Sequence, residues 1–344
     1  MNFNYSLINK KFHYLVIEIF FKNVKSFIRS EQSKLILLLI IVCILNYIIP
    51  LYGINANNKN IKIALCTMGK NENLYAREFI EYYINLGVEH LFIYDDNDPF
   101  TQKIEDILDF KYKDKVSIYN AKQLKLNNQS DAFNNCYENN LKIYSWFIMV
   151  DMDEYLYIVN DTLKNYLTKQ EFNNCDFIKI HWVVSNDNNL LYYDSRPLFE
   201  RFPKPYLKSR FIKSIIRGNI TNLKYWVHSP FISPDRNVTC DNEGKKIQYK
   251  YMNFESIDEI NIKKAYLIHF RFKSTEEFIN KYKRGYSNWH GNEIGKILKL
   301  RLKEYFQQNG ITLEKIELIE KELKLNLTKY RNALNSSNNL FSNK

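Results

Sequence analysis

The stretch WFIMVDMDEYL, residues 146–156, decides the fold class and the place of the site. Its first five residues form an uninterrupted apolar run, which is typical of a strand buried on both faces of a parallel sheet. This run leads directly into Asp151, Asp153 and Glu154. Because ligands of open α/β sheets bind at the carboxyl ends of parallel strands, we expect the acids to lie at a ligand site.

The residues before this stretch alternate between strand and helix patterns. A short apolar run, a helical pattern that closes at Gly87 and a second apolar run predict a strand, helix and strand unit with a right-handed crossover. The predicted strands cover residues 61–67, 90–94 and 116–119, and the predicted helices cover residues 74–86 and 130–144. The fold class predicted from the sequence is α/β, with a mostly parallel sheet flanked by helices.

Composition identifies a folded chain and excludes some classes of site. The 344 residues are 45% hydrophobic and 25% charged. This composition is typical of a folded globular chain and excludes the disordered and fibrous classes. The five cysteines form no CxxC pair and no zinc-type spacing with histidine, so the sequence predicts no structural zinc site. Four of them follow residue 60 and allow three disulfide pairings, among which the sequence does not choose: Cys66, Cys136, Cys175 and Cys240.

The formal net charge of +11 raises the question of a polyanionic partner. The lysines are scattered among asparagine and isoleucine, without an arginine-rich run or the glycine and aromatic signature of an RNA-binding sheet. We therefore predict no binding to nucleic acid. A basic cleft for a diphosphate and a membrane surface remain as explanations of the charge.

Residues 35–54 are uncharged and mostly leucine and isoleucine. Twenty helical residues span about 30 Å, the thickness of the hydrocarbon core, so we predict a transmembrane helix here, with a buried core helix as the alternative. Basic residues outnumber acidic ones in residues 1–34, which predicts a cytoplasmic tail and a single-pass type II protein. Residues 55–60 are a short polar linker to the body of the protein.

Asp151 and Asp153 are two positions apart. If the chain stays extended after the strand, both carboxylates project to the same side. Two hard oxygen ligands with open positions left on the ion suit Mg²⁺ or Mn²⁺ that carries a diphosphate. The pair therefore predicts a divalent-metal site, although acids after a strand also commonly cap a turn.

Six stretches that occur in order between Ile61 and Gly285 carry a family resemblance: IALCTMGKNENLYAREFIEYYINLGVEHLFIYDDND, WFIMVDMDEYL, ERF, KSIIR, WVHSP and HFRFKSTEEFINKYKRG. With them the chain resembles glycosyltransferase family 92 and its close relatives, which have a nucleotide-sugar-binding GT-A fold. The resemblance implies transfer of a hexose, typically galactose from UDP-galactose, onto a glycan or glycoconjugate acceptor. It also implies Mn²⁺ or Mg²⁺ held by the DxD acids and, in a eukaryote, a membrane protein that faces the Golgi or ER lumen.

The resemblance also implies roles for single residues. Asp151 and Asp153 match the metal motif, and His269 matches a histidine that completes the metal site, with a buried core histidine as the alternative. The residues expected at the nucleobase and ribose are Thr67, Asn71, Glu72 and Asp95. Those expected at the diphosphate are Lys273 and Ser274, of which Ser274 also forms a capping box with Glu277. Residues placed only generally in the cleft are Lys213, Arg217 and His228.

An inverting transfer needs a carboxylate that takes the proton of the acceptor hydroxyl. Asp187, Asp194 and Glu200 all follow the strand pattern IHWVV, and we favour Asp187, with a solvated turn as the alternative for each. This segment reads VVSNDNN where the family usually has a glycine, which leaves the acceptor open. A catalytically inactive glycan- or nucleotide-sugar-binding protein on the same fold is therefore the alternative function.

Residues 292–308 and 312–334 have apolar positions at helical spacing with lysine and glutamate between them. They predict two amphipathic helices that pack on the catalytic body. The predicted organisation is a catalytic GT-A domain at residues 61–290, C-terminal helices at residues 291–334 and a disordered tail at residues 335–344.

Overall fold

The computed structural model describes residues 61–204, 206–231, 238–247, 260–284 and 293–335. The chain divides into two units at residues 1–59 and 60–344, and all described residues belong to the second unit. The predicted tail (1–34), membrane span (35–54) and linker (55–60) lie outside the described residues, and so does the C-terminal tail from residue 336. Among the described residues, no helix combines the length and the apolar character that a membrane crossing requires.

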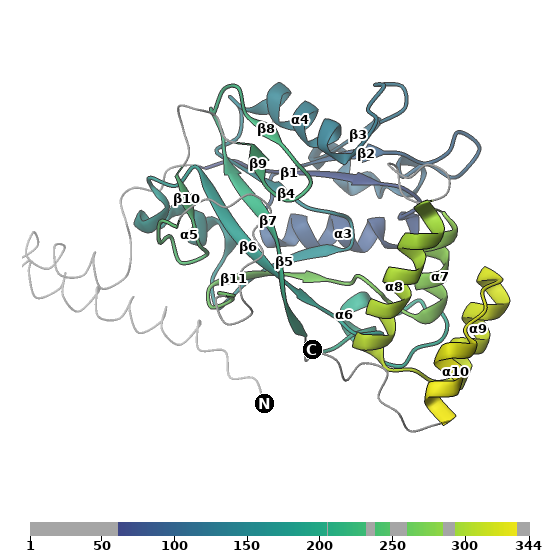
Figure 1. Cartoon of the computed structure of the whole chain (residues 1–344). Helices are drawn as coiled ribbons and strands as arrows, with labels where there is room; N and C mark the ends of the chain where they lie inside the picture. Colours follow the sequence, from purple (N-terminus) through teal and green to yellow (C-terminus); the bar gives the residue numbers. More distant parts are fainter. Residues whose placement is uncertain (1–60, 205, 232–237, 248–259, 285–292, 336–344) are drawn as a thin grey trace, which may run out of the picture. The chain divides into compact units, whose positions relative to one another are not determined.

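One sheet forms the centre of the second unit (Figure 1). In the part of the chain that the structure describes, the strand order is β3-β2-β1-β4-β7-β6-β11-β5, and β10 pairs with β6. The strands are β1 (Ile63–Gly69), β2 (His90–Asp95), β3 (Val116–Asn120), β4 (Trp146–Met149), β5 (Glu154–Ile158), β6 (Phe177–Val184), β7 (Leu207–Arg217), β10 (Thr239–Cys240) and β11 (Ala265–His269). A separate ribbon pairs β8 (Lys224–Tyr225) with β9 (Pro230–Phe231).

The strand directions bring the polar segments to one edge of the sheet. Strands β1 to β4 are mutually parallel, β7 is antiparallel to both β4 and β6, and β11 is parallel to β6. The carboxyl ends of β1, β2, β4, β6 and β11 therefore share one edge. The sheet is mixed, because β7 and β5 run against their neighbours.

Two helices cover opposite faces of the parallel half of the sheet. Helix α3 (Asn73–Leu86) packs with Leu65 in one core cluster, and α4 (Gln129–Asn140) packs with Cys66 in another. Neighbouring residues of a strand point to opposite faces, so the two helices lie on different sides of the sheet. Gly87 ends α3 with a left-handed φ of 106°, as the sequence predicted.

The four cysteines of the body form two disulfides. Cys66–Cys136 joins β1 to α4, and Cys175–Cys240 joins the segment before β6 to β10. This is one of the three pairings that the sequence left open. Each bridge closes a chain segment of more than sixty residues, with sequence separations of 70 and 65, and so restricts the unfolded chain substantially.

The remaining helices are mostly C-terminal. They are α5 (Leu163–Thr168), α6 (Leu198–Arg201), α7 (Thr275–Lys283), α8 (Glu293–Asn309), α9 (Leu313–Leu323) and α10 (Thr328–Asn335), with 3₁₀ turns at Glu105–Ile107, Phe110–Lys115 and Gln170–Phe172. The single helix predicted for residues 312–334 is two helices, because Lys324 adopts a left-handed φ of 54°. Tyr305 of α8 and Ile316 of α9 share a buried cluster with Val184 and Phe278, so these helices pack on the end of β6 and on α7.

Candidate active site

Two cavities open at the carboxyl edge of the sheet. The larger has a volume of about 390 Å³, and its walls include Tyr75, Tyr193 and Glu276. The smaller has a volume of about 160 Å³, and its walls include Lys70, Asp96, Gln129, Asp151 and Asp153. Both cavities are lined by Glu72, Lys281 and Arg284, so they meet at these three side chains.

Asp153 is the buried acid of the smaller cavity. Its Oδ2 accepts a hydrogen bond from Lys281 Nζ at 2.7 Å, and its Oδ1 lies 3.4 Å from His269 Nε2. Burial raises the pKa of this carboxyl, but Lys281 and His269 outweigh burial and hold it well below its usual range. Asp153 is therefore charged at neutral pH.

His269 ends β11 directly beside Asp153 and is 5% exposed. Its ring packs edge-on against Trp182 with centroids 4.4 Å apart, and its Nδ1 has no hydrogen-bond partner among the described residues. Burial lowers the pKa of His269 in spite of Asp153, so the imidazole is neutral at pH 7 and keeps a lone pair. His269 is therefore buried, as a core histidine would be, and it also faces the Asp153 carboxylate, which lines the smaller cavity.

The chain turns between the two predicted metal acids. Glu154 N donates to Asp151 O at 3.1 Å, which closes a tight turn over Met152 and Asp153. The extended conformation expected from the sequence is therefore wrong here, and the two carboxylates have different partners. Asp151 Oδ1 accepts from Lys213 Nζ at 2.7 Å and from the side chain of Gln129.

Lys213 is a buried lysine of β7 that neutralises this acidic turn. Its Nζ also donates to Val227 O at 2.7 Å and lies 3.9 Å from Glu154 Oε2. Burial alone would lower the pKa of Lys213, but Asp151 and Glu154 raise it, so the lysine stays charged. Glu154 itself is fully buried, and burial together with Asp151 raises the pKa of its carboxyl well above the usual range.

Two of the three predicted metal ligands lie about as far apart as adjacent ligands of one ion. Adjacent ligands of an octahedral ion with bonds of about 2.1 Å lie about 3 Å apart, and Asp153 Oδ1 and His269 Nε2 are separated by 3.4 Å. Asp151 is turned toward Lys213 instead. In the described part of the chain, no group of three His, Cys, Asp or Glu side chains is placed to hold a metal ion.

Glu72 lies at the junction of the two cavities. Its carboxylate pairs with Arg284 of the α7 C-terminus and with Lys273 Nζ at 3.3 Å. Burial raises the pKa of Glu72, but Lys273 and Arg284 outweigh it and the pKa is lowered. Lys273 in turn lies over the ring of Tyr75, 3.4 Å from its centroid, and burial lowers the pKa of Lys273.

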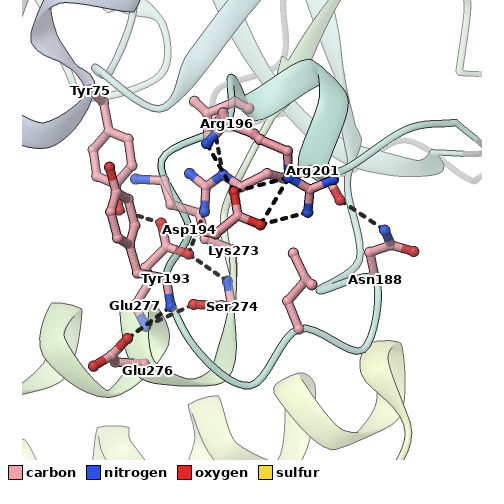
Figure 2. Close-up of polar contacts among 12 residues, drawn as sticks. Tyr75, Asn188, Tyr193, Asp194, Arg196, Arg201, Lys273, Ser274, Glu276 and Glu277 are labelled. Atoms are coloured by element: carbon pink, nitrogen blue, oxygen red, sulfur yellow. Dashed lines mark hydrogen bonds and ion pairs between the residues drawn. The ribbon is translucent and has the colours of Figure 1, made fainter.

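Ser274 and Glu277 form the predicted capping box at the start of α7, which confirms that inference. Figure 2 shows how Tyr75, Arg201 and Ser274 converge on the Glu277 carboxylate. Arg201 Nη1 donates to Glu277 Oε2 at 2.8 Å, and both side chains are buried. Ser274 is fully buried and lines neither cavity, so its observed role is to begin the helix.

The loops after β1 and β2 place only some of the predicted nucleoside-binding residues at the cavities. Asn71 and Glu72 line the larger cavity, whereas Thr67 is buried within β1. Both oxygens of Asp95 accept backbone N–H groups, from Asn97 and Ile104, at 2.9 Å each. Asp95 therefore fixes the loop, and its neighbour Asp96 lines the smaller cavity instead.

Arg217 and His228 line neither cavity. Arg217 ends β7, which runs against β4, and is therefore at the opposite edge of the sheet, stacked on Trp146 and bonded to Cys175 O. His228 lies against Trp182, with Nδ1 3.2 Å from Ile212 O. The direction of β7 thus places Arg217 at the opposite end of the strands from the cavities. His228 packs on the same Trp182 ring as His269 but does not reach a cavity wall.

Asp187 is a buried structural acid. Its Oδ2 lies 2.7 Å from both Tyr305 Oη and Lys315 Nζ, and its Oδ1 accepts from Asn189 N at 2.9 Å. These contacts join the loop after β6 to α8 and α9, and Asp187 lines neither cavity. Asn188 and Asn189 adopt left-handed φ values of 48° and 56°, which asparagine tolerates and glycine would also allow.

The other two candidate bases also fail to line either cavity. Asp194 is paired with Arg196 at the surface, and Glu200 is an exposed residue of α6. Three carboxylates line the larger cavity: Glu72, Glu277 and Glu276, of which Glu276 has its Oε2 accepting from Tyr193 N at 2.8 Å (Figure 2). In the described ranges Glu276 forms no ion pair.

Sequence reasoning missed the cations of α7. Glu277, Lys281 and Arg284 are spaced by four and three residues, so they share one face of the helix. This spacing, directly after the histidine strand, was the signal that could have identified Lys281 and Arg284. Lys70, Asp96 and Gln129 gave no such signal, because each comes from a different loop or helix end.

A sheet that gathers acids, a histidine and cations at the carboxyl ends of its strands defines an α/β protein with a candidate ligand site at that edge. The family model of glycosyltransferase family 92 matches residues 59–303, and the chain belongs to this family. A family 92 protein of Oryza sativa subsp. japonica is 27% identical over 126 residues, which cover 35% of this chain and 21% of that protein. A family 92 protein of Ricinus communis is 28% identical over 111 residues, covering 30% and 19%. This chain thus matches about a fifth of the length of either relative.

Solved structures show weaker likeness. TarS of S. aureus is similar over 77% of this chain and 49% of that chain, with 11% identity and a TM-score of 0.30. HddC from Yersinia pseudotuberculosis is similar over 46% of this chain and 74% of that chain, with 12% identity and a TM-score of 0.27. Scores this low support no conclusion about the ligands or the chemistry of this chain.

Proposed function

We propose that this protein is a GT-A glycosyltransferase that moves a hexose from a nucleotide-sugar donor to a glycan or glycoconjugate acceptor. UDP-galactose is the first donor to test, since the family resemblance implies it. The observation that carries the proposal is the Asp153 carboxylate, held between His269 and Lys281 in a cavity at the carboxyl edge of the sheet. Membership of family 92 supports the same reaction class.

The smaller cavity is the proposed diphosphate site. Lys70, Lys281 and Arg284 supply cations around it, and ionised donors form the strong hydrogen bonds that phosphate oxygens accept. Asp153 and His269 would hold Mn²⁺ or Mg²⁺ there, with Asp151 at the same cavity. A bound ion would supply positive charge at the leaving diphosphate, which the lysine and arginine side chains also stabilise.

The larger cavity is the proposed acceptor site. Tyr75 and Tyr193 give it aromatic walls, and Asn280 and Glu276 give it polar groups that can orient hydroxyls. It joins the smaller cavity at Glu72, Lys281 and Arg284, so an acceptor there would meet the donor at this junction. Glu276 is the proposed general base, because it is the carboxylate of this cavity without a cation partner in the described ranges.

The test is a donor screen with full-length protein in mild detergent, following release of nucleotide diphosphate with and without Mn²⁺. Asp153→Asn keeps the shape of the side chain and removes its charge, so turnover per folded molecule should fall about 100-fold or more. Asp161→Asn is the matched control, since Asp161 pairs with Lys169 away from both cavities. Turnover by Asp153→Asn at the wild-type rate over a Mn²⁺ titration would refute the metal assignment.

We also propose that residues 35–54 anchor the protein as a type II membrane protein whose body faces the Golgi or ER lumen in a eukaryote. The support is the uncharged apolar stretch after a basic tail. Two disulfides in the body fit an oxidising compartment. Carbonate extraction should leave the full-length protein in the membrane pellet, and recovery in the supernatant would remove the anchor.

A further inference from the structure

Lys281 occupies the cation position beside the proposed metal ligand. It belongs to α7, and its Nζ lies 2.7 Å from Asp153 Oδ2, on the other oxygen from His269. The Asp153 side chain is 6% exposed and that of Lys281 is 18% exposed, so water screens this pair little. Lys281 is therefore the internal counter-charge of Asp153.

Lys281 also faces both cavities, together with Arg284 and Glu72. At this junction Lys273 and Arg284 are already paired with Glu72. Lys281 pairs with Asp153 instead. A metal ion bound to Asp153 would therefore repel the ammonium of Lys281 more strongly than it would repel Lys273 or Arg284. A diphosphate in the smaller cavity would give the ammonium another anionic partner within the same cavity.

We propose that Lys281 competes with a divalent cation for Asp153 and thereby couples metal binding to binding of the donor diphosphate. This inference rests on the proposed function. Two cations beside one buried carboxylate repel each other, so Lys281 weakens metal binding to the empty site. A diphosphate attracts Lys281 and relieves that repulsion, so nucleotide and metal bind better together than alone. By thermodynamic linkage, nucleotide raises the affinity for metal by the same factor by which metal raises the affinity for nucleotide.

The test measures Mn²⁺ binding by isothermal titration calorimetry or electron paramagnetic resonance, with Mn²⁺ alone and then with saturating UDP. The full-length protein should bind Mn²⁺ weakly alone and more tightly with UDP. Lys281→Met should bind Mn²⁺ alone about tenfold more tightly than the wild type, because a charged hydrogen bond contributes about that factor. The enhancement by UDP should shrink in the same variant, whereas Lys281→Arg should keep it.

Lys283→Met is the matched control. It removes the same charge from the same helix, but Lys283 pairs with Glu322 at the surface and should leave Mn²⁺ binding unchanged. A melting curve establishes that each variant is folded, and Lys281→Gln serves as a second variant if Lys281→Met is not. Mn²⁺ affinity of the Lys281 variant equal to or below that of the wild type, including no binding at all, overturns the inference. Failure of the proposed function shows separately, as no release of nucleotide from any donor by the wild type.

Discussion

Arg201 and Glu277 form a buried ion pair with Nη1 and Oε2 2.8 Å apart, between two segments that are 76 positions apart in the sequence. Arg201 ends α6, and Glu277 is in the first turn of α7, where it also caps the helix and accepts from Tyr75 (Figure 2). The pair fixes α7, and with it Lys281 and Arg284, relative to the sheet. The geometry of the proposed site thus depends on a buried ion pair, and one member of this pair, Glu277, also lines the larger cavity.

Removing either partner should destabilise the protein by about 3–5 kcal/mol, because a buried charge is left unpaired. Arg201→Met and Glu277→Gln should each lower the midpoint of urea unfolding, and the double variant should lose less than the sum of the two. Additive losses in this double-mutant cycle would mean that the two side chains do not interact in solution.

Glu276→Gln should reduce glycosyl transfer by about 100-fold or more and leave UDP binding unchanged, because a general base contributes about that factor. Asp187→Asn should act on stability, since it leaves Lys315 buried without its carboxylate. Rates come from nucleotide release and stability from melting curves. Full activity of folded Glu276→Gln would show that Glu276 is not the general base.

His269→Gln should raise the Mn²⁺ concentration needed for half-maximal turnover while the melting temperature stays near that of the wild type. The amide is a weaker ligand than a neutral imidazole but has similar size and polarity. His90→Gln is the control, because His90 bonds to Ser117 far along the sheet. An unchanged Mn²⁺ requirement with a lower melting temperature would make His269 a core residue.

His228 should make the protein less stable in acid. Burial, helped by Lys213, lowers the pKa of His228 to about 4, below its ordinary value of 6.5. Between pH 6.5 and 4 the His228 imidazole is therefore protonated in the unfolded chain but not in the folded protein. The free energy of unfolding decreases as the pH falls through this range. His228→Gln should flatten the pH dependence of unfolding in this window by at most about 1.4 kcal/mol per pH unit. Identical slopes for wild type and variant would contradict the buried neutral ring.

Local patterns in the sequence predicted the local structure well. The strand before Asp151, the helix that ends at Gly87 and the capping box at Ser274 all follow from spacing and from residue type. The family resemblance implied that His269 lies near Asp153, and the structure brings the two together. These features were predictable because each depends on residues close in the sequence or on strands that end at the same edge of the sheet.

Long-range contacts were not predictable in the same way. Asp187 lies in a polar stretch that is typical of an exposed loop, and its partner Tyr305 is 118 positions away. No residue near Asp187 in the sequence therefore indicated that its carboxylate is buried. Arg217 was misplaced because the direction of β7 depends on its pairing with β4. The turn over Met152 separated Asp151 from Asp153 through one backbone hydrogen bond that no residue pattern indicated.

The contacts of Asp187 also show where a shortened polypeptide would fail. The part of the chain that matches family 92 ends at residue 303, inside α8, whereas Tyr305, Asn309 and Lys315 all bond to Asp187 or its backbone beyond that point. A protein cut at the family boundary would keep the acid and lose all three. We therefore expect a fragment that folds to extend through α9 to Leu327, which is buried in one cluster with Tyr305 and Ile316.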